Sequence, residues 1–180
     1  QYLVQGLAAG SFYALAALGL AVIFGVVGEV NFAHGACYML GAVISAVLLD
    51  TLGLGFWAAL VVVPVIMFGA GLVLERLLVR RLAQLDPLYN FLLTFGLTVL
   101  LVDLVKRRYG VSGLPYTRPE ALTGQLVVGG LRLPIYQVFV LGFTLLICAG
   151  VYLLLSRTRI GMIVRAATER PELAGALGVD

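Results

Sequence analysis

Charged residues are scarce in this chain. Only 12% of its 180 residues are charged, whereas 62% are hydrophobic, and the mean hydropathy is +1.08. A soluble domain carries about 25% charged and about 45–50% apolar residues, and a domain of this size leaves much of its surface in water. The composition therefore argues against a soluble enzyme and a disordered tail. The 12 Lys and Arg residues are scattered and form no basic patch, which argues against nucleic-acid binding. A membrane protein with several crossings remains.

Residues that hold metals or act as nucleophiles are also few. The chain has one histidine, His34, and two cysteines, Cys37 and Cys148, which lie inside apolar runs. Isolated thiols in such positions are typical of small packing residues, and His34 with Cys37 provides too few ligands for a metal. No phosphate-binding Gly-x-x-x-x-Gly-Lys-Ser/Thr loop and no convincing catalytic triad is present. We therefore expect no catalytic residue, metal or cofactor in this chain.

Long charge-free runs predict the membrane crossings. A helix needs about 20 apolar residues to cross about 30 Å of hydrocarbon, and the runs do not alternate as barrel strands do. The first, third and fifth of five runs are long enough, whereas the second and fourth either borrow flanking residues or are broken, re-entrant segments. In order, the runs are Gln1–Gly28, Gly35–Leu49, Thr51–Leu74, Pro87–Val102 and Leu133–Ser156. We expect an all-α, polytopic transmembrane helix bundle over residues 1–156.

Arginines in the loops indicate an orientation, because cytoplasmic loops carry an excess of Lys and Arg. The loop Glu75–Asp86 holds three arginines and the tail Arg157–Asp180 holds four, so we place both in the cytoplasm. The loop Tyr109–Arg132, rich in Gly and Pro, then lies outside. Lys106–Arg108 lies at that outer end against the bias, and Asp103 is near enough to offset part of the charge. In the alternative, residues 87–102 dip into the membrane and return; we prefer a crossing.

Small residues recur on one face of the first run. Gly6, Gly10 and Ala14 are spaced four residues apart, which leaves room for the backbone of another helix. Ordinary helix packing, with no part in a functional site, is the simpler interpretation.

A polar stretch separates the first two apolar runs. Residues 25–35 read Gly-Val-Val-Gly-Glu-Val-Asn-Phe-Ala-His-Gly. Where a helix unwinds in a membrane, its free backbone groups face protein or a wet cavity, and transporters use such breaks to hold polar substrates. On this interpretation Asn31, His34 and Gly35 line a substrate path. In the alternative, Glu29 lies at the cytoplasmic surface, Asn31 caps the helix Phe32–Leu49 by accepting from the N–H of residue 33 or 34, and His34 only meets a nearby carbonyl.

The tail after the last run predicts two short helices. The first covers Gly161–Glu169, and the second begins at Pro171 and stops at Gly178. Leu173 and Leu177 share one face of the second helix. Such a pair needs a surface on which to dock, and a protein groove and the bilayer surface are equally compatible with the pattern.

Several of these motifs together resemble a known family. The tail pattern, Gly161-x-x-x-Arg165-Ala166-x-x-x-x-Pro171-Glu172-x-Ala174-x-Ala176-Leu177-Gly178, is similar to the coupling loop of ABC-importer permeases. The front of the chain resembles the LivH-type permease of branched-chain amino acid importers, through Gly10-Ser-x-Tyr13-Ala-Leu-x-Ala-Leu-Gly19, Asn31-Phe-Ala-His-Gly35 and Tyr38-Met-Leu-Gly41. The middle agrees in Glu75-Arg76, Arg80, Pro87-Leu88 and Thr94-x-Gly96-Leu97. The resemblance covers essentially the whole chain.

The resemblance implies a transporter in a bacterial or archaeal cytoplasmic (inner) membrane. Its expected partners are a second, LivM-like permease, two ATP-binding cassette subunits that bind ATP and Mg, an extracytoplasmic substrate-binding protein and membrane lipid. Residues 157–180 would then form the ATPase-coupling segment, with its contacts at Gly161, Arg165, Ala166, Pro171, Glu172, Leu173, Leu177 and Gly178. Family members continue beyond the position matching Asp180, so we expect an incomplete permease.

The substrate is less well defined by the resemblance. Related members of the family carry urea, short amides or aromatic acids. The rival from another class is a structural or assembly membrane protein whose amphipathic tail rests on lipid.

Overall fold

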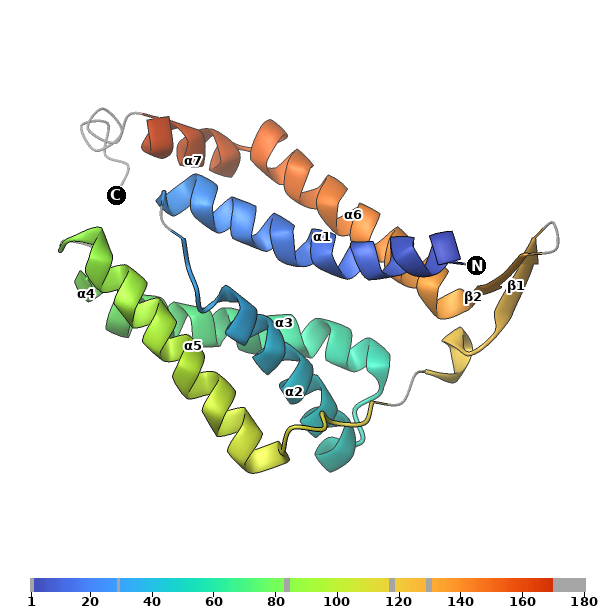
Figure 1. Cartoon of the computed structure of the whole chain (residues 1–180). Helices are drawn as coiled ribbons and strands as arrows, with labels where there is room; N and C mark the ends of the chain where they lie inside the picture. The colour runs from blue at the N-terminus through green and yellow to red at the C-terminus, as the bar shows by residue number, and fades with distance from the viewer. Residues whose placement is uncertain (1, 29, 83–84, 117–118, 129–130, 170–180) are drawn as a thin grey trace. The chain divides into compact units, whose positions relative to one another are not determined.

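A computed structural model shows a chain built almost entirely of helices (Figure 1). It describes residues 2–28, 30–82, 85–116, 119–128 and 131–169. The long helices are α1 (Tyr2–Val27), α2 (His34–Leu52), α3 (Phe56–Leu74), α5 (Pro87–Tyr109) and α6 (Ile135–Arg157). A π-helical turn, Glu75–Val79, and the short α4 (Arg80–Leu82) extend α3, while α7 (Arg159–Glu169) follows α6. The expected all-α class is confirmed.

Five helices in the described part of the chain are long and apolar enough to span a membrane. They lie at Gln5–Gly25, His34–Leu52, Phe56–Leu82, Pro87–Tyr109 and Ile135–Arg157. The two short runs of the sequence borrow flanking residues to reach this length. The second gains His34 and the turn Asp50–Leu52, and the fourth gains 103–109 within one continuous helix. These spans make the chain a multi-pass membrane protein.

The chain divides into two compact units, which we call the terminal unit (residues 1–30 and 120–180) and the central unit (residues 31–119). In the terminal unit α6 contacts α1, and α7 contacts both. Figure 1 shows α1 and α6 side by side, with their N-terminal ends toward the same end of this unit.

A small hairpin precedes α6 in the terminal unit. Strands β1 (Gln125–Val128) and β2 (Leu131–Pro134) pair antiparallel, with Gln125 opposite Pro134 and Val128 opposite Leu131. The short 3₁₀ turn Glu120–Leu122 leads into it. The sequence predicted only a turn-rich loop here, because a four-residue strand is too short to stand out among the surrounding Gly and Pro residues.

The central unit packs α2 against α3 and α5. Gly53, at φ 61°, ends α2 in the left-handed conformation that glycine adopts at no steric cost. Asp86 caps α5, because its Oδ1 accepts a 2.9 Å hydrogen bond from the N–H of Leu88, and Pro87 suits the first turn. The sequence places a stop and a start signal at these helix ends.

The buried residues are small, and the large apolar side chains face outward. The buried residues include Ala8, Ala33, Ala36, Ala46, Ala59, Ser11, Thr94 and Thr144. Leu, Val, Ile and Phe side chains are exposed on all five long helices. A water-soluble fold would bury these residues, whereas helices in lipid pack through small residues and leave the large ones to the hydrocarbon. The two cysteines, Cys37 and Cys148, are free thiols.

Candidate functional site

The polar stretch of the sequence lies between two complete helices. Helix α1 stops at Gly28, whose φ of 74° and 2.9 Å N–H bond to the carbonyl of Phe24 form a glycine C-terminal stop. Helix α2 begins six residues later, at His34. This break also falls at the boundary between the terminal and central units. Glu29 lies outside the described residues.

Asn31 has the geometry of a cap. Its Oδ1 accepts a 2.9 Å hydrogen bond from the N–H of Ala33, and its backbone carbonyl accepts one of 3.2 Å from the N–H of His34. Ala33 is 2% exposed, so its N–H needs a partner from the protein. The helix starts at His34, two residues later than the capping alternative expected. The expected hydrogen bond from the N–H of residue 33 to Asn31 is present, but the N-cap position of α2 is Ala33, which has no side-chain cap hydrogen bond.

Phe32 packs this turn against α5. Its ring meets that of Phe91 edge to face, with centroids 4.9 Å apart, and Phe91 stacks in parallel on Phe95 at 6.3 Å. Phe91 is only four residues beyond the start of α5 at Pro87, so the contact lies roughly 6 Å along that helix. The polar turn is therefore near the end of the central unit that follows the basic loop Glu75–Asp86, and not at the middle of the helices.

The other two candidate path residues continue from this turn. His34 is half-buried at the first position of α2, and Gly35 is exposed. A methyl group added at Gly35 would meet no described atom within 4 Å. The structure thus brings Asn31, His34 and Gly35 together on one turn, with open space beside the glycine.

The terminal unit contains an open groove that the sequence analysis did not identify as a site. It lies between α1 and α6 and has a volume of about 630 Å³. We call it the α1/α6 groove. Its lining residues are Leu3, Gly6, Leu7, Gly10, Ser11, Ala14, Leu141, Thr144, Leu145 and Cys148. The stripe Gly6, Gly10, Ala14 was the available signal, but its pairing with residues about 130 positions later cannot be read from spacing.

Two hydroxyls lie in the wall of the groove. Ser11 is 6% exposed and donates to the carbonyl of Leu7 at 2.9 Å. Thr144 is 5% exposed, and its Oγ1 has no hydrogen-bond partner among the described atoms. No described atom lies within 4 Å of a methyl group built on Gly6 or Gly10, so the small-residue stripe is not filled by α6.

The junction of α6 and α7 is a turn without a loop. Thr158 lies between them, and its Oγ1 accepts from the N–H of Gly161 at 3.4 Å, as an N-cap does. Gly161 is buried, and a side chain there would overlap the backbone of Leu155. Only glycine allows this approach. The first tail helix therefore begins at Arg159, two residues before the predicted start.

The tail residues fall into two groups. Gly161, Arg165 and Ala166 belong to α7, where Arg165 and Ala166 are exposed. The remaining coupling candidates lie outside the described residues, and they are Pro171, Glu172, Leu173, Leu177 and Gly178.

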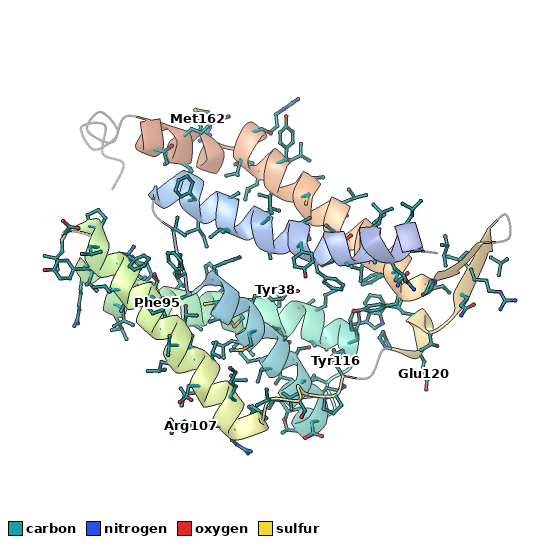
Figure 2. All side chains as sticks on the ribbon, in the orientation of Figure 1. Tyr38, Phe95, Arg107, Tyr116, Glu120 and Met162 are labelled. Atoms are coloured by element: carbon teal, nitrogen blue, oxygen red, sulfur yellow. The ribbon has the colours of Figure 1, made fainter. Side chains whose placement is uncertain are left out.

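The basic end of α5 is exposed. Arg107, which is labelled in Figure 2, forms a 2.6 Å ion pair with Asp103, and the guanidinium of Arg108 lies 5.3 Å from the ring centroid of Tyr109. The expected offset of positive charge by Asp103 is therefore present at Arg107. The spacing of four residues places Arg107 over the carboxylate.

Comparison with known proteins points to transport permeases. Residues 2–180 match the family model described as branched-chain amino acid transport system / permease component. The chain is 30% identical over 193 positions to the high-affinity branched-chain amino acid transport system permease protein BraD of Pseudomonas aeruginosa, covering 100% of the chain and 62% of BraD. It is 28% identical to the LivH permease protein of Escherichia coli K12, with the same coverage. No solved structure matches.

A third relative agrees with these two. The probable LivH permease of Methanocaldococcus jannaschii is 28% identical over 178 positions, which is 92% of the chain and 54% of that protein. The chain thus spans less than two thirds of the length of these relatives.

Proposed function

Because the chain belongs to the family of permease components of branched-chain amino acid transport systems, we propose that it acts in the membrane-spanning subunit of an ATP-driven importer for branched-chain amino acids. The family match over residues 2–180, together with five helices long enough to cross a bilayer, carries this proposal. The permease itself performs no catalysis. Two partner ATP-binding cassette subunits would bind ATP and Mg and hydrolyse the nucleotide.

The orientation follows from the arginine-rich loops. If α5 and α6 each cross the membrane once, the loop 75–86 and the tail after α6 would lie on the same side of it. We assign this side to the cytoplasm. The hairpin β1–β2 then lies outside, where a substrate-binding protein would deliver its ligand, and a second, LivM-like permease would complete the path within the bilayer.

Residues 157–180 would be the ATPase-coupling segment. The turn at Thr158 and Gly161 packs α7 directly on the end of α6, and α7 also contacts α1. A rigid-body motion of docked ATPases would therefore reach two membrane helices without passing through a flexible loop. Gly161 fixes this junction, Arg165 and Ala166 offer an exposed face, and Pro171, Glu172, Leu173, Leu177 and Gly178 would complete the contact.

Asn31, His34 and Gly35 would form part of the path at the cytoplasmic end of the central unit. The hydrogen bond to Asn31 holds the turn, His34 is half-buried at the first position of α2, and Gly35 leaves space. This placement would suit an exit from the membrane better than a binding site at its midplane.

Reconstitution tests the proposed function. The complete permease that carries this sequence, with its second permease and ATPases, is placed in liposomes with the binding protein, and uptake of labelled leucine is measured with and without ATP. We expect ATP-dependent uptake of leucine. Uptake of urea, a short amide or an aromatic acid in place of leucine would assign the substrate to another branch of the family.

The alternative hypothesis, a structural or assembly membrane protein whose tail rests on lipid, has a separate test. Leu177→Asp removes an apolar anchor whose full burial is worth about 1.5–3 kcal/mol. If the tail docks on protein, the variant should co-purify with fewer ATPase subunits and lose uptake, while membrane insertion is unchanged. Full retention of the ATPases with normal uptake would remove Leu177 from the coupling contact.

A further inference from the structure

The shape of the α1/α6 groove suits an aliphatic group. Its walls carry leucines from both helices, Leu3 and Leu7 from α1 and Leu141 and Leu145 from α6. The small residues Gly6 and Gly10 leave empty space in it. Its volume of about 630 Å³ lies within the range of about 300–1,000 Å³ typical of small-molecule sites. It therefore has room for an amino acid together with some of its water.

The buried hydroxyl of Thr144 shows that the groove is not meant for hydrocarbon alone. Thr144 is 5% exposed and its Oγ1 is without a partner among the described atoms. A buried hydroxyl without a hydrogen bond is costly, and a lipid acyl chain offers none. An occupant with a polar group beside an apolar body would therefore suit this groove better than a lipid acyl chain.

The depth of the two hydroxyls places them far from both membrane surfaces. Ser11 and Thr144 are each nine residues beyond the first residue of their helix, Tyr2 in α1 and Ile135 in α6, which is roughly 14 Å along it. The hydrocarbon core is about 30 Å thick, so both lie near its middle. A passing substrate is a partner that the Thr144 hydroxyl would meet at this depth, whereas Ser11 already donates to the carbonyl of Leu7.

The groove would hold such a substrate only weakly. None of its ten lining residues is charged, so the ammonium and carboxylate of an amino acid would find hydroxyls and retained water but no ion pair. Weak binding is what a translocation path requires, because a ligand that is held too firmly does not leave.

From these observations we propose that the α1/α6 groove is a low-affinity subsite of the transport path, in which the leucine walls receive the aliphatic side chain of the amino acid and Thr144 hydrogen-bonds its polar part. The proposal rests on the proposed function and adds a location, in the terminal unit, that neither the polar motif nor the comparisons assign.

Substrate protection of Cys148 tests this location directly. Cys148 lines the groove, and Cys37 belongs to the central unit. In a Cys37→Ala background of the assembled transporter, modification of Cys148 by N-ethylmaleimide is followed with saturating leucine, with glycine, or with neither. We expect leucine to slow the reaction several-fold and glycine to have little effect, because glycine has no side chain to fill the groove. Ala149→Cys, made with Cys148→Ser in this background, is the matched control on an exposed position outside the groove lining, and it should not be protected.

Two other results would overturn the proposal. If Cys148 reacts at the same rate with and without leucine, the substrate does not enter the groove. If Cys148 fails to react in the assembled transporter but reacts in the isolated permease, another helix covers the groove and the small-residue stripe is a packing surface. In both cases leucine uptake by the reconstituted transporter can be normal, whereas failure of the proposed function would appear as absence of leucine uptake altogether.

The hydroxyl has its own test. Thr144→Val keeps the shape of the side chain and removes the hydrogen bond, so we expect KM for leucine to rise roughly two- to tenfold, the range that one lost hydrogen bond gives. Thr144→Ser should restore KM, because it returns the hydroxyl. An unchanged KM in Thr144→Val, with assembly and ATPase rate intact, would show that Thr144 does not meet the substrate.

Discussion

Buried threonines in the central and terminal units differ in their hydrogen bonding. In the central unit Thr94 is buried and donates to the carbonyl of Phe91 at 3.1 Å, and Thr98 donates to that of Thr94 at 2.8 Å. In the terminal unit Thr144 has no such partner in the described structure. The polar stretch at residues 25–35, which stands out most in the sequence, lies between the end of α1 and the start of α2. The open groove lies instead between α1 and α6, where the sequence is less distinctive.

The two units also differ in the size of the residues at their contacts. Phe32, Phe91 and Phe95 form a continuous aromatic cluster where α2 meets α5. Gly6, Gly10 and Ala14 lie where α1 faces α6. Large rings fill space and fix a turn, while small residues leave space for something else. The polar turn is therefore held by aromatic contacts, whereas the small residues of α1 leave the groove open.

Thiol labelling tests the orientation of both units in the membrane. It has the largest expected effect, because each cysteine is either labelled or not labelled in intact cells. In a background lacking Cys37 and Cys148, single cysteines are placed at two sites in each unit. Val111 and Leu85 represent the central unit, and Leu126 and Met162 the terminal unit; all four are exposed. We expect an impermeant maleimide to label Val111→Cys and Leu126→Cys in intact spheroplasts, and to label Leu85→Cys and Met162→Cys only after the membrane is opened.

Two labelling outcomes would contradict this prediction. If Val111→Cys and Leu85→Cys behave alike, α5 does not cross the membrane and the dipping alternative for residues 87–102 is correct. If all four sites exchange their behaviour, the orientation is reversed.

Gly161→Val should have the next largest effect. A side chain at Gly161 would overlap the backbone of Leu155, and forcing extra atoms into a packed position costs about 1–3 kcal/mol. We expect the α6–α7 junction to shift, so that less ATPase co-purifies and uptake falls while the permease still inserts. Gly142→Val is the matched control in α6, because a methyl group there meets no described atom within 4 Å. Equal losses in both variants would show that β-branching in α6 and α7, and not the junction, is responsible.

Much of this fold could be predicted from local sequence, because each membrane helix carries its own signal. Gly53 and Asp86 end and start helices by backbone conformation and capping, which are properties of a few neighbouring residues. The α1/α6 groove could not be predicted, since it depends on Thr144 facing a helix more than a hundred residues earlier. The ring of Phe91 against Phe32 has the same origin in long-range packing. The hairpin was missed for a different reason, because its strands are only four residues long.

Two substitutions of Asn31 distinguish a role in starting α2 from a contact with the substrate. Asn31→Ala removes the acceptor for the N–H of Ala33, and losing such a cap costs about 0.5–2 kcal/mol. Asn31→Ser returns an oxygen acceptor but no amide N–H. We expect thermal unfolding in detergent to show a loss of stability in the Ala variant that is largely recovered in the Ser variant, while leucine uptake stays low in both. Recovery of uptake together with stability would reduce Asn31 to a cap.

The smallest effect expected is in the aromatic cluster. Phe91→Leu removes both the edge-to-face contact with Phe32 and the stack on Phe95, and an aromatic pair contributes about 0.5–1.5 kcal/mol beyond the area it buries. Phe95→Leu removes only the stack. The terminal unit provides a matched control, because Phe139 and Phe143 stack at 5.8 Å with the same spacing of four residues.

The unfolding temperatures of the three variants rank the aromatic contacts by their contribution to stability. In detergent we expect Phe91→Leu to lower the unfolding temperature more than Phe95→Leu or Phe143→Leu, which should be similar to each other. A double-mutant cycle of Phe32→Leu with Phe91→Leu should return a coupling of about 0.5–1.5 kcal/mol. If Phe91→Leu is no worse than Phe143→Leu and the coupling is zero, the ring of Phe32 does not fasten the polar turn. The rigidity of the central unit would then rest on the Asn31 cap alone, and the contrast with the terminal unit would be one of side-chain size without consequence for stability.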